Sequence, residues 1–210
     1  MNAFRKAIDK TVIFFIFCFL FFMPLNSQEK TPAPYLIYVK EIINSFVKEV
    51  KKEYKLECVG SGGSMPYDVC SITVLLSIDK RANINEARKL GLIITRKLIN
   101  KINSHEKIRP YLHQYPFTDN NVWVSISFRN PKKGTHFLDG SVATAGFLEG
   151  DVFYTTAKIH KIHDPGLICG KTGKYLRPPK EVEDETLVTI LKETYEEAEA
   201  IVEREKQANL

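Results

Sequence analysis

Apolar residues recur at spacings of three and four in two stretches of the chain, residues 35–54 and 84–102, with charged residues between them. This periodicity is typical of amphipathic helices. Asn83 precedes the second stretch and Glu86 stands three residues later, which is the pattern of a capping box. A final helix is predicted over about 182–206, where apolar positions recur among acidic residues.

Alternation of apolar and polar residues predicts strands between these helices. The segments are a short one at 56–59, a clear one at 69–78, another at 121–128, and two more near 138–146 and 151–159. The turn at 148–151 makes the last two a β-hairpin. The predicted elements follow the order helix, strand, helix, three strands and helix. This order favours an α+β fold in which a small, mainly antiparallel sheet of about four or five strands packs against about three helices. One domain, 35–206, is predicted.

The remaining segments contain the turn-forming and aromatic residues. Residues 60–68 are rich in glycine and serine and are predicted to form a loop. An aromatic connector with two prolines spans 108–117, and residues 160–179 show no regular pattern.

The N-terminus has the composition of a secretory signal peptide, predicted over residues 1–27. Basic residues precede an apolar run at 11–23, and Ser27 offers a small residue for cleavage. The run is shorter than the ~20 residues that span a bilayer, so membrane contact is expected only through an uncleaved signal segment. A polar leader, 28–34, follows. We therefore expect an exported protein, in the periplasm or outside the cell.

Charge and glycine patterns argue against two classes of ligand. Thirty Lys and Arg against 25 Asp and Glu give +5, too weak a balance to indicate a nucleic-acid partner. Residues 60–68 precede a strand, whereas a phosphate-binding loop precedes a helix. The segment 166–172 has Pro165 where a nucleotide motif needs its first glycine. No cofactor is expected.

Export changes the interpretation of the cysteines, since disulfides persist in oxidising compartments. Cys58, Cys70 and Cys169 remain after the signal peptide. Cys58 and Cys70 flank the glycine-rich segment and are candidates for a bridge. The alternative is that all three are small buried thiols.

Three metal-capable side chains lie close together in the sequence: His160, His163 and Asp164. Two histidines and a carboxylate with an open coordination position suit a metal-dependent hydrolase. However, histidines three residues apart on a strand point to opposite faces. Solvated histidines in a lysine-rich segment are the favoured interpretation.

A binding rim is predicted from the order of the segments. If the strands at 69–78 and 121–128 run parallel, the helix between them is long enough for the crossover, and the glycine-rich loop and the aromatic connector share one edge of the sheet. The rim would contain Gly62, Gly63, Met65, Tyr67, Arg109, Tyr111 and Tyr115. Loop amides, one cation and aromatic faces suit an anionic or peptide ligand better than hydrolysis.

Three short motifs are similar to those of a group of uncharacterised exported proteins of intracellular bacteria. They are Gly62-Gly-Ser-Met-Pro66, then Ile84-Asn-Glu-Ala-Arg88, then Ile108-Arg-Pro-Tyr-Leu112 followed by Tyr115-Pro-Phe117. The resemblance covers roughly 35–160. It implies export and supplies no catalytic residue.

Two functions remain open at this point. The favoured one is a non-catalytic module that binds a protein, peptide or small-molecule ligand. The alternative is an envelope hydrolase, metal-dependent through His160, His163 and Asp164. Whether the protein is an enzyme is left undecided by the sequence.

Overall fold

The computed structural model describes residues 33–168, 170 and 174–208. The predicted signal peptide and nearly all of the leader lie outside these residues, as does Cys169. From Pro34 onward the described residues form one compact unit. Within the described part of the chain, no helix is long and apolar enough to cross a membrane.

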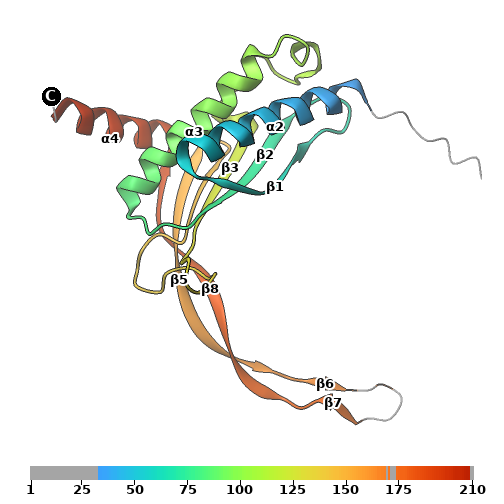
Figure 1. The fold of residues 1–210 in the computed structure, drawn as a ribbon, viewed down its shortest axis with the longest axis vertical. Helices are drawn as coiled ribbons and strands as arrows, with labels where there is room; N and C mark the ends of the chain where they lie inside the picture. The colour runs from blue at the N-terminus through green and yellow to red at the C-terminus, as the bar shows by residue number, and fades with distance from the viewer. Residues whose placement is uncertain (1–32, 169, 171–173, 209–210) are drawn as a thin grey trace, which may run out of the picture. The chain divides into compact units, whose positions relative to one another are not determined.

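The fold is α+β, as predicted, with three α-helices and a mixed sheet among the described residues (Figure 1). The helices are α2 (Pro34–Tyr54), α3 (Ile84–Ser104) and α4 (Tyr195–Ala208). The main sheet has six strands in the order β1-β2-β3-β4-β5-β8, more than the four or five expected. They are β1 (Glu57–Ser64), β2 (Ser71–Ile78), β3 (Val122–Phe128), β4 (Thr144–Leu148), β5 (Asp151–Asp164) and β8 (Lys180–Thr194).

One pair of neighbouring strands is parallel, and the other pairs are antiparallel. β2 and β3 run parallel from Ile72 opposite Val122 to Ile78 opposite Phe128, with α3 as the crossover. The remaining pairs of the main sheet are antiparallel. The starts of β2 and β3 therefore share one end of the sheet.

The core lies between the helices and one face of the sheet. Its fully buried side chains include Phe46 of α2, Leu98 of α3 and Val124 of β3. Gly91 of α3 sits directly on the ring of Phe147, where a Cβ would overlap the ring. The glycine therefore permits the close approach of α3 to β4.

The predicted capping box of α3 is confirmed. The Glu86 N–H donates to Asn83 Oδ1 at 2.9 Å, and the Asn83 N–H donates to Glu86 Oε2 at 3.0 Å. The hairpin predicted around 148–151 is also present, with Leu148 opposite Asp151 at its end. Its first strand is shorter than expected, and its second continues to Asp164.

The glycine-rich segment was wrongly predicted to be a loop throughout. It continues β1 as far as Ser64, and Gly60–Ser64 pair with β2 from Leu75 to Ser71. Glycine lowers intrinsic strand propensity. Pairing with the apolar strand β2 nevertheless holds the segment extended.

The prediction of a helix over 182–206 was wrong in its first half. Lys180–Thr194 form β8, and the helix α4 begins only at Tyr195. β8 pairs with β5 along its whole length, from Lys180 opposite Asp164 to Thr194 opposite Asp151. The β-branched residues of the segment favour a strand over a helix. Together with the long pairing with β5, they outweigh the helix-like spacing of its apolar residues.

The segment 160–179, expected to be irregular, is largely extended. β5 runs to Asp164, and β6 (Leu167–Ile168) pairs with β7 (Tyr175–Arg177). Beyond Thr155, β5 pairs with β8 alone. We call residues 156–164 and 180–188 the β5–β8 ribbon.

Candidate functional site

The glycine-rich segment and the aromatic connector lie at the same end of the sheet. The parallel pairing of β2 and β3 places the starts of both strands there. Main-chain contacts then join the connector to the residues before β2: the Val69 N–H donates to the Tyr111 carbonyl at 2.8 Å, and the His113 N–H donates to the Val69 carbonyl at 3.0 Å. The arrangement required for the predicted rim is therefore present.

A groove of about 570 Å³ lies between α2 and β1. We call it the α2–β1 groove. Its lining residues are Leu36, Val39, Lys40, Ile43 and Asn44 from α2, with Ser61, Gly62 and Gly63 of β1 and Met65 just beyond. Three residues of the predicted rim, Gly62, Gly63 and Met65, thus belong to one concave surface.

Tyr111 lies beside this groove as part of a tyrosine cluster. Its ring centroid is 6.0 Å from that of Tyr35 and 6.1 Å from that of Tyr38, both on α2. The Tyr35 hydroxyl donates to the Met65 carbonyl at 3.2 Å. Tyr35 therefore connects the groove to the connector, and Tyr111 supports the groove from outside its lining.

The other three predicted rim residues are not brought into the groove. The Arg109 guanidinium stacks 5.3 Å from the ring centroid of Tyr115, and its Nε donates to the Asn103 carbonyl. Tyr67 is 92% exposed and projects into solvent. The single predicted rim is therefore divided into a groove and a separate aromatic surface.

A cluster of Asp68, Cys70 and His113 lies next to the start of β2. The Cys70 thiol donates to Asp68 Oδ1 at 3.2 Å, and His113 Nδ1 lies 2.8 Å from Asp68 Oδ2. Hydrogen bonds from His113 and then Cys70 lower the pKa of the Asp68 carboxyl. The same hydrogen bond to Asp68 raises the pKa of the Cys70 thiol, which disfavours the thiolate that a cysteine nucleophile requires.

Cys58 and Cys70 are both free thiols in the structure, so the candidate bridge between them is not formed. Cys58 lies opposite Leu76 of β2, while Cys70 immediately precedes the first residue of that strand. Six residues of extended chain span about 20 Å. A disulfide needs Cα atoms within about 7 Å, so the two thiols lie too far apart.

The structure does not bring His160, His163 and Asp164 together as metal ligands. His163 Nδ1 lies 3.3 Å from Glu181 Oε1, and Asp164 binds the Arg177 guanidinium through both carboxylate oxygens. His160 lies opposite Asp184 across the ribbon. Because alternate residues of a strand face opposite sides, the two imidazoles diverge. The three side chains therefore do not form the metal site that the alternative of a metal-dependent hydrolase requires.

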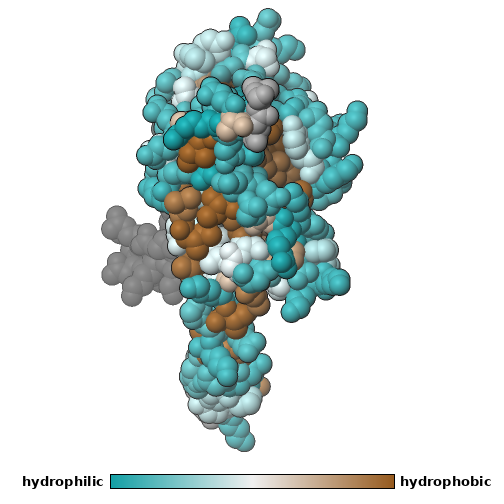
Figure 2. All heavy atoms as spheres, turned by 90° about the vertical axis from the view of Figure 1, so that its left-hand side faces the viewer, coloured by the Kyte–Doolittle hydropathy of each residue, from teal (hydrophilic) through white to brown (hydrophobic). Residues whose placement is uncertain are grey.

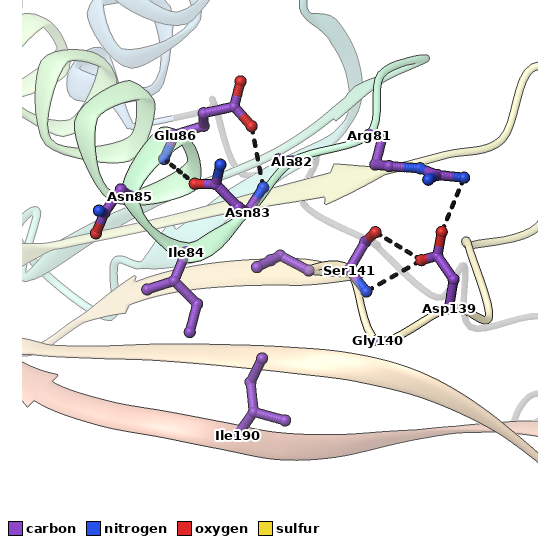
Figure 3. Close-up of a pocket in the computed structure, with 11 residues that line it drawn as sticks. Arg81, Ala82, Asn83, Ile84, Asn85, Glu86, Asp139, Gly140, Ser141 and Ile190 are labelled. Atoms are coloured by element: carbon purple, nitrogen blue, oxygen red, sulfur yellow. Dashed lines mark hydrogen bonds and ion pairs between the residues drawn. The ribbon is translucent and has the colours of Figure 1, made fainter.

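A second hollow, of about 650 Å³, lies beside the start of α3 (Figure 3). Its polar side chains already have partners. Arg81 pairs with Asp139 at 2.8 Å, Ser141 donates to Asp139, and Asn83 and Glu86 cap the helix. Ile190 of β8 forms an apolar wall. Its polar groups are therefore committed to the fold rather than directed at a ligand.

Ser127, His136 and Glu185 are linked in series by hydrogen bonds. Ser127 Oγ lies 2.9 Å from His136 Nε2, and His136 Nδ1 contacts Glu185 Oε1. The His136 N–H also donates to Glu185. These hydrogen bonds fasten the loop between β3 and β4 to β8.

Sequence reasoning missed both of these clusters. His113 stands 43 residues after Cys70, and His136 stands 49 residues before Glu185. The only local signal was Asp68-Val-Cys70, two ligand types with one residue between them. Comparison with known proteins adds no further residue: no family model, no curated protein and no solved structure matches this chain.

Proposed function

We propose that this protein is a non-catalytic binding module that takes up an extended peptide as an added strand along β1. The observation that carries the proposal is the α2–β1 groove, which lies beside an edge strand. In β-strand addition, main-chain hydrogen bonds supply affinity, and pockets for alternate side chains supply specificity. The edge strand β1 and the groove beside it support this mode of binding.

β1 offers the edge of the sheet. It is the first strand in the order and pairs only with β2 among the described strands. A register shift between Cys58 and Gly60 interrupts the start of the strand, but pairing is regular from Gly60 to Ser64. Natural edge strands are usually protected by lysine, proline or bulges. The segment Gly60–Ser64 contains neither lysine nor proline, and its three glycines leave room for an approaching backbone.

The groove supports a particular peptide chemistry. Leu36, Val39, Ile43 and Met65 provide an apolar lining, with Leu36 42% exposed. Lys40 also lines the groove and makes no ion pair with any residue that the structure describes. Side chains of an added strand alternate in direction, so every second one would enter the groove. We therefore propose an extended segment with apolar residues at alternate positions and a carboxylate that reaches Lys40.

Ser61 and Gly62 offer a matched pair of variants, because they face opposite sides of the sheet. Ser61 lies opposite the buried Val74, on the side of the helices, whereas Gly62 lies opposite the half-buried Thr73. A Cβ at Gly62 meets nothing within 4 Å. Gly62 lines the groove with its backbone alone, and a side chain there would extend from the opposite face of the sheet. Ser61→Leu should therefore fill the groove, and Gly62→Leu should leave it open.

The experiment selects binders from a random heptapeptide library and follows them by NMR on labelled protein. We expect chemical-shift changes confined to β1 and α2, and slower hydrogen exchange of the β1 amides as they pair with the peptide. Ser61→Leu should weaken binding at least tenfold while Gly62→Leu binds normally. Peptides that bind equally well to Ser61→Leu, or that leave the β1 amides unprotected, would show that the proposal is wrong.

A hydrolase is the second candidate function, favoured by the order of groups in Ser127, His136 and Glu185. A serine hydroxyl, an imidazole and a carboxylate in this sequence of contacts are the parts of a nucleophile–base–acid triad. Ser127, however, lies within β3 and pairs with both Ser77 and Thr144, so the sheet uses its backbone groups. Acyl transfer requires free amides beside the nucleophile.

We expect a fluorophosphonate probe to leave Ser127 unlabelled. Labelling that is lost in Ser127→Ala and kept in Ser125→Ala would favour the hydrolase.

We also propose that the protein acts after export, in the periplasm or outside the cell. The support is the composition of residues 1–27, a basic start followed by an apolar run. A binding module for peptides in that compartment needs neither cofactor nor nucleotide.

A further inference from the structure

Asp68, Cys70 and His113 lie on two segments that the backbone holds together. Val69 and Leu112 form a parallel bridge, flanked by the hydrogen bonds between Val69 and the residues on either side of Leu112. Each segment thus presents its side chains from a defined position. The spacing of the three groups is set by the sheet and the connector.

Three different ligand types meet at this point. Each side chain contributes one potential ligand atom: a carboxylate oxygen, a sulfur or an imidazole nitrogen. These three atoms lie within 4.8 Å of one another. Ligands of a tetrahedral ion with bonds of about 2.0–2.3 Å are separated by roughly 3.3–3.8 Å. The contacts of 3.2 Å and 2.8 Å that link the three groups are shorter than this separation, and the outer limit of 4.8 Å is longer, so small side-chain adjustments would reach the tetrahedral spacing. Within the described ranges, this is the one place where such a set comes together.

We propose that Asp68, Cys70 and His113 bind a divalent transition-metal ion of the zinc class. A thiolate and an imidazole select such ions over Mg²⁺ and Ca²⁺, which prefer oxygen ligands. Three protein ligands leave one position of a tetrahedral ion for water or an added ligand. The His113 side chain is 65% exposed, so that position faces solvent. Binding releases the thiol proton of Cys70 to solvent as the metal–sulfur bond forms.

This site goes beyond the proposed peptide groove and does not depend on it. Groove and cluster are linked through the chain, because Met65 lines the groove three residues before Asp68. The metal would fasten the start of β2 to the connector. Its binding can be measured with no peptide present, so the two proposals can fail separately.

The experiment is a Co²⁺ titration of the purified full chain under a thiol-free reductant, followed by competition with Zn²⁺. We expect one equivalent to produce the near-ultraviolet charge-transfer band of a thiolate bound to cobalt, and Zn²⁺ to abolish it. Cys70→Ser should remove the band. Loss of a direct ligand should weaken binding by more than the ~10–100-fold that second-shell changes cost, so we expect Asp68→Asn and His113→Asn to lower affinity at least ~100-fold.

Matched controls separate this site from the other thiols and histidines. Cys58→Ser, Cys169→Ser and His163→Gln should all keep the band and the affinity. The exposed His113 makes His113→Asn a variant that should fold normally, as the metal-free melting curve will check. A band that survives Cys70→Ser, a band lost in Cys169→Ser, normal affinity in His113→Asn, or no band at all would each overturn the proposal.

Discussion

Arg88 and Glu193 form a buried ion pair between α3 and β8, with only 6% and 7% of their side chains exposed. The guanidinium binds both carboxylate oxygens, at 2.7 and 3.0 Å, and the Tyr154 hydroxyl donates to the same carboxylate at 2.7 Å. Burial, together with the nearby Glu193, raises the pKa of Tyr154 well above its usual range, so the phenol remains a donor. One carboxylate therefore accepts hydrogen bonds from two buried side chains.

Removal of the Glu193 charge should be costly, because it leaves the Arg88 cation buried without a counterion. We expect Glu193→Gln to lower the free energy of unfolding by roughly 3–5 kcal/mol, measured by chemical denaturation. Glu199→Gln is the matched control, since its partner Arg96 is 52% exposed and such pairs contribute about 1 kcal/mol or less.

The double variant Arg88→Met/Glu193→Gln distinguishes the buried charge from general damage to packing. It should recover part of the stability lost in Glu193→Gln, because no unpaired charge remains. The interpretation would be contradicted if the two substitutions acted additively. The double variant would then be less stable than Glu193→Gln by the full cost of Arg88→Met.

At the scale of elements, β5 and β8 differ from the other strands because half of their length lies outside the core. The last buried residue of β5 is Ala157, and the ribbon beyond it pairs only with itself. Apolar side chains at Ile159, Ile162 and Leu187 are exposed there, and Figure 2 shows brown apolar patches among the polar surface on one side of the molecule. The ribbon is a two-stranded extension of the sheet.

Shortening the ribbon should leave the core intact. Lys161 and Glu183 are directly opposite each other, so an Asn-Gly turn can join them in place of residues 162–182. We expect the unfolding free energy to change by less than about 1 kcal/mol, because none of the removed residues that the structure describes is buried. Phe147→Ala, in β4, is the destabilising control and should cost roughly 3–5 kcal/mol. A loss in the shortened protein comparable to that control would mean that the ribbon supports the core.

At the scale of the whole molecule, the α+β unit that begins at Pro34 contains every residue of the peptide groove and of the proposed metal site. The groove and the Asp68–Cys70–His113 cluster lie at the end of the sheet where β2 and β3 start. Every residue of both sites follows Ser27 in the sequence, so cleavage of the predicted signal peptide would remove none of them. The exported form should carry both sites complete.

Export predicts a defined N-terminus for the released protein. We expect mass spectrometry of the exported product to find a chain that begins near Gln28, because Ser27 is the small residue before the predicted cleavage point. Retention of the apolar run 11–23 in the exported product would contradict cleavage and indicate an N-terminally anchored protein.

Local patterns in the sequence were sufficient for elements whose signals lie within a few residues. The periodicity of 84–102, with Asn83 and Glu86 at its start, identified α3 and its capping box. The alternation in 121–128 identified β3, and the turn at 148–151 identified the hairpin. Each of these signals reflects the geometry of the element itself, 3.6 residues per turn or an alternation of two. The sequence also carried the fold class, since the order of elements limits the layers they can form.

Strand pairing in the tertiary structure decided the segments whose local sequence patterns were ambiguous or led to a wrong prediction. β8 is a strand because β5 lies beside it, and the glycines of β1 are extended because β2 pairs with them. The parallel register of β2 and β3 joins the connector to the start of β2, and that contact creates the Asp68–Cys70–His113 cluster. Free energies of strand pairing depend on residues distant in the chain, so no local pattern contains them. The candidate site is made almost entirely of such contacts, and only the tertiary structure could assemble it.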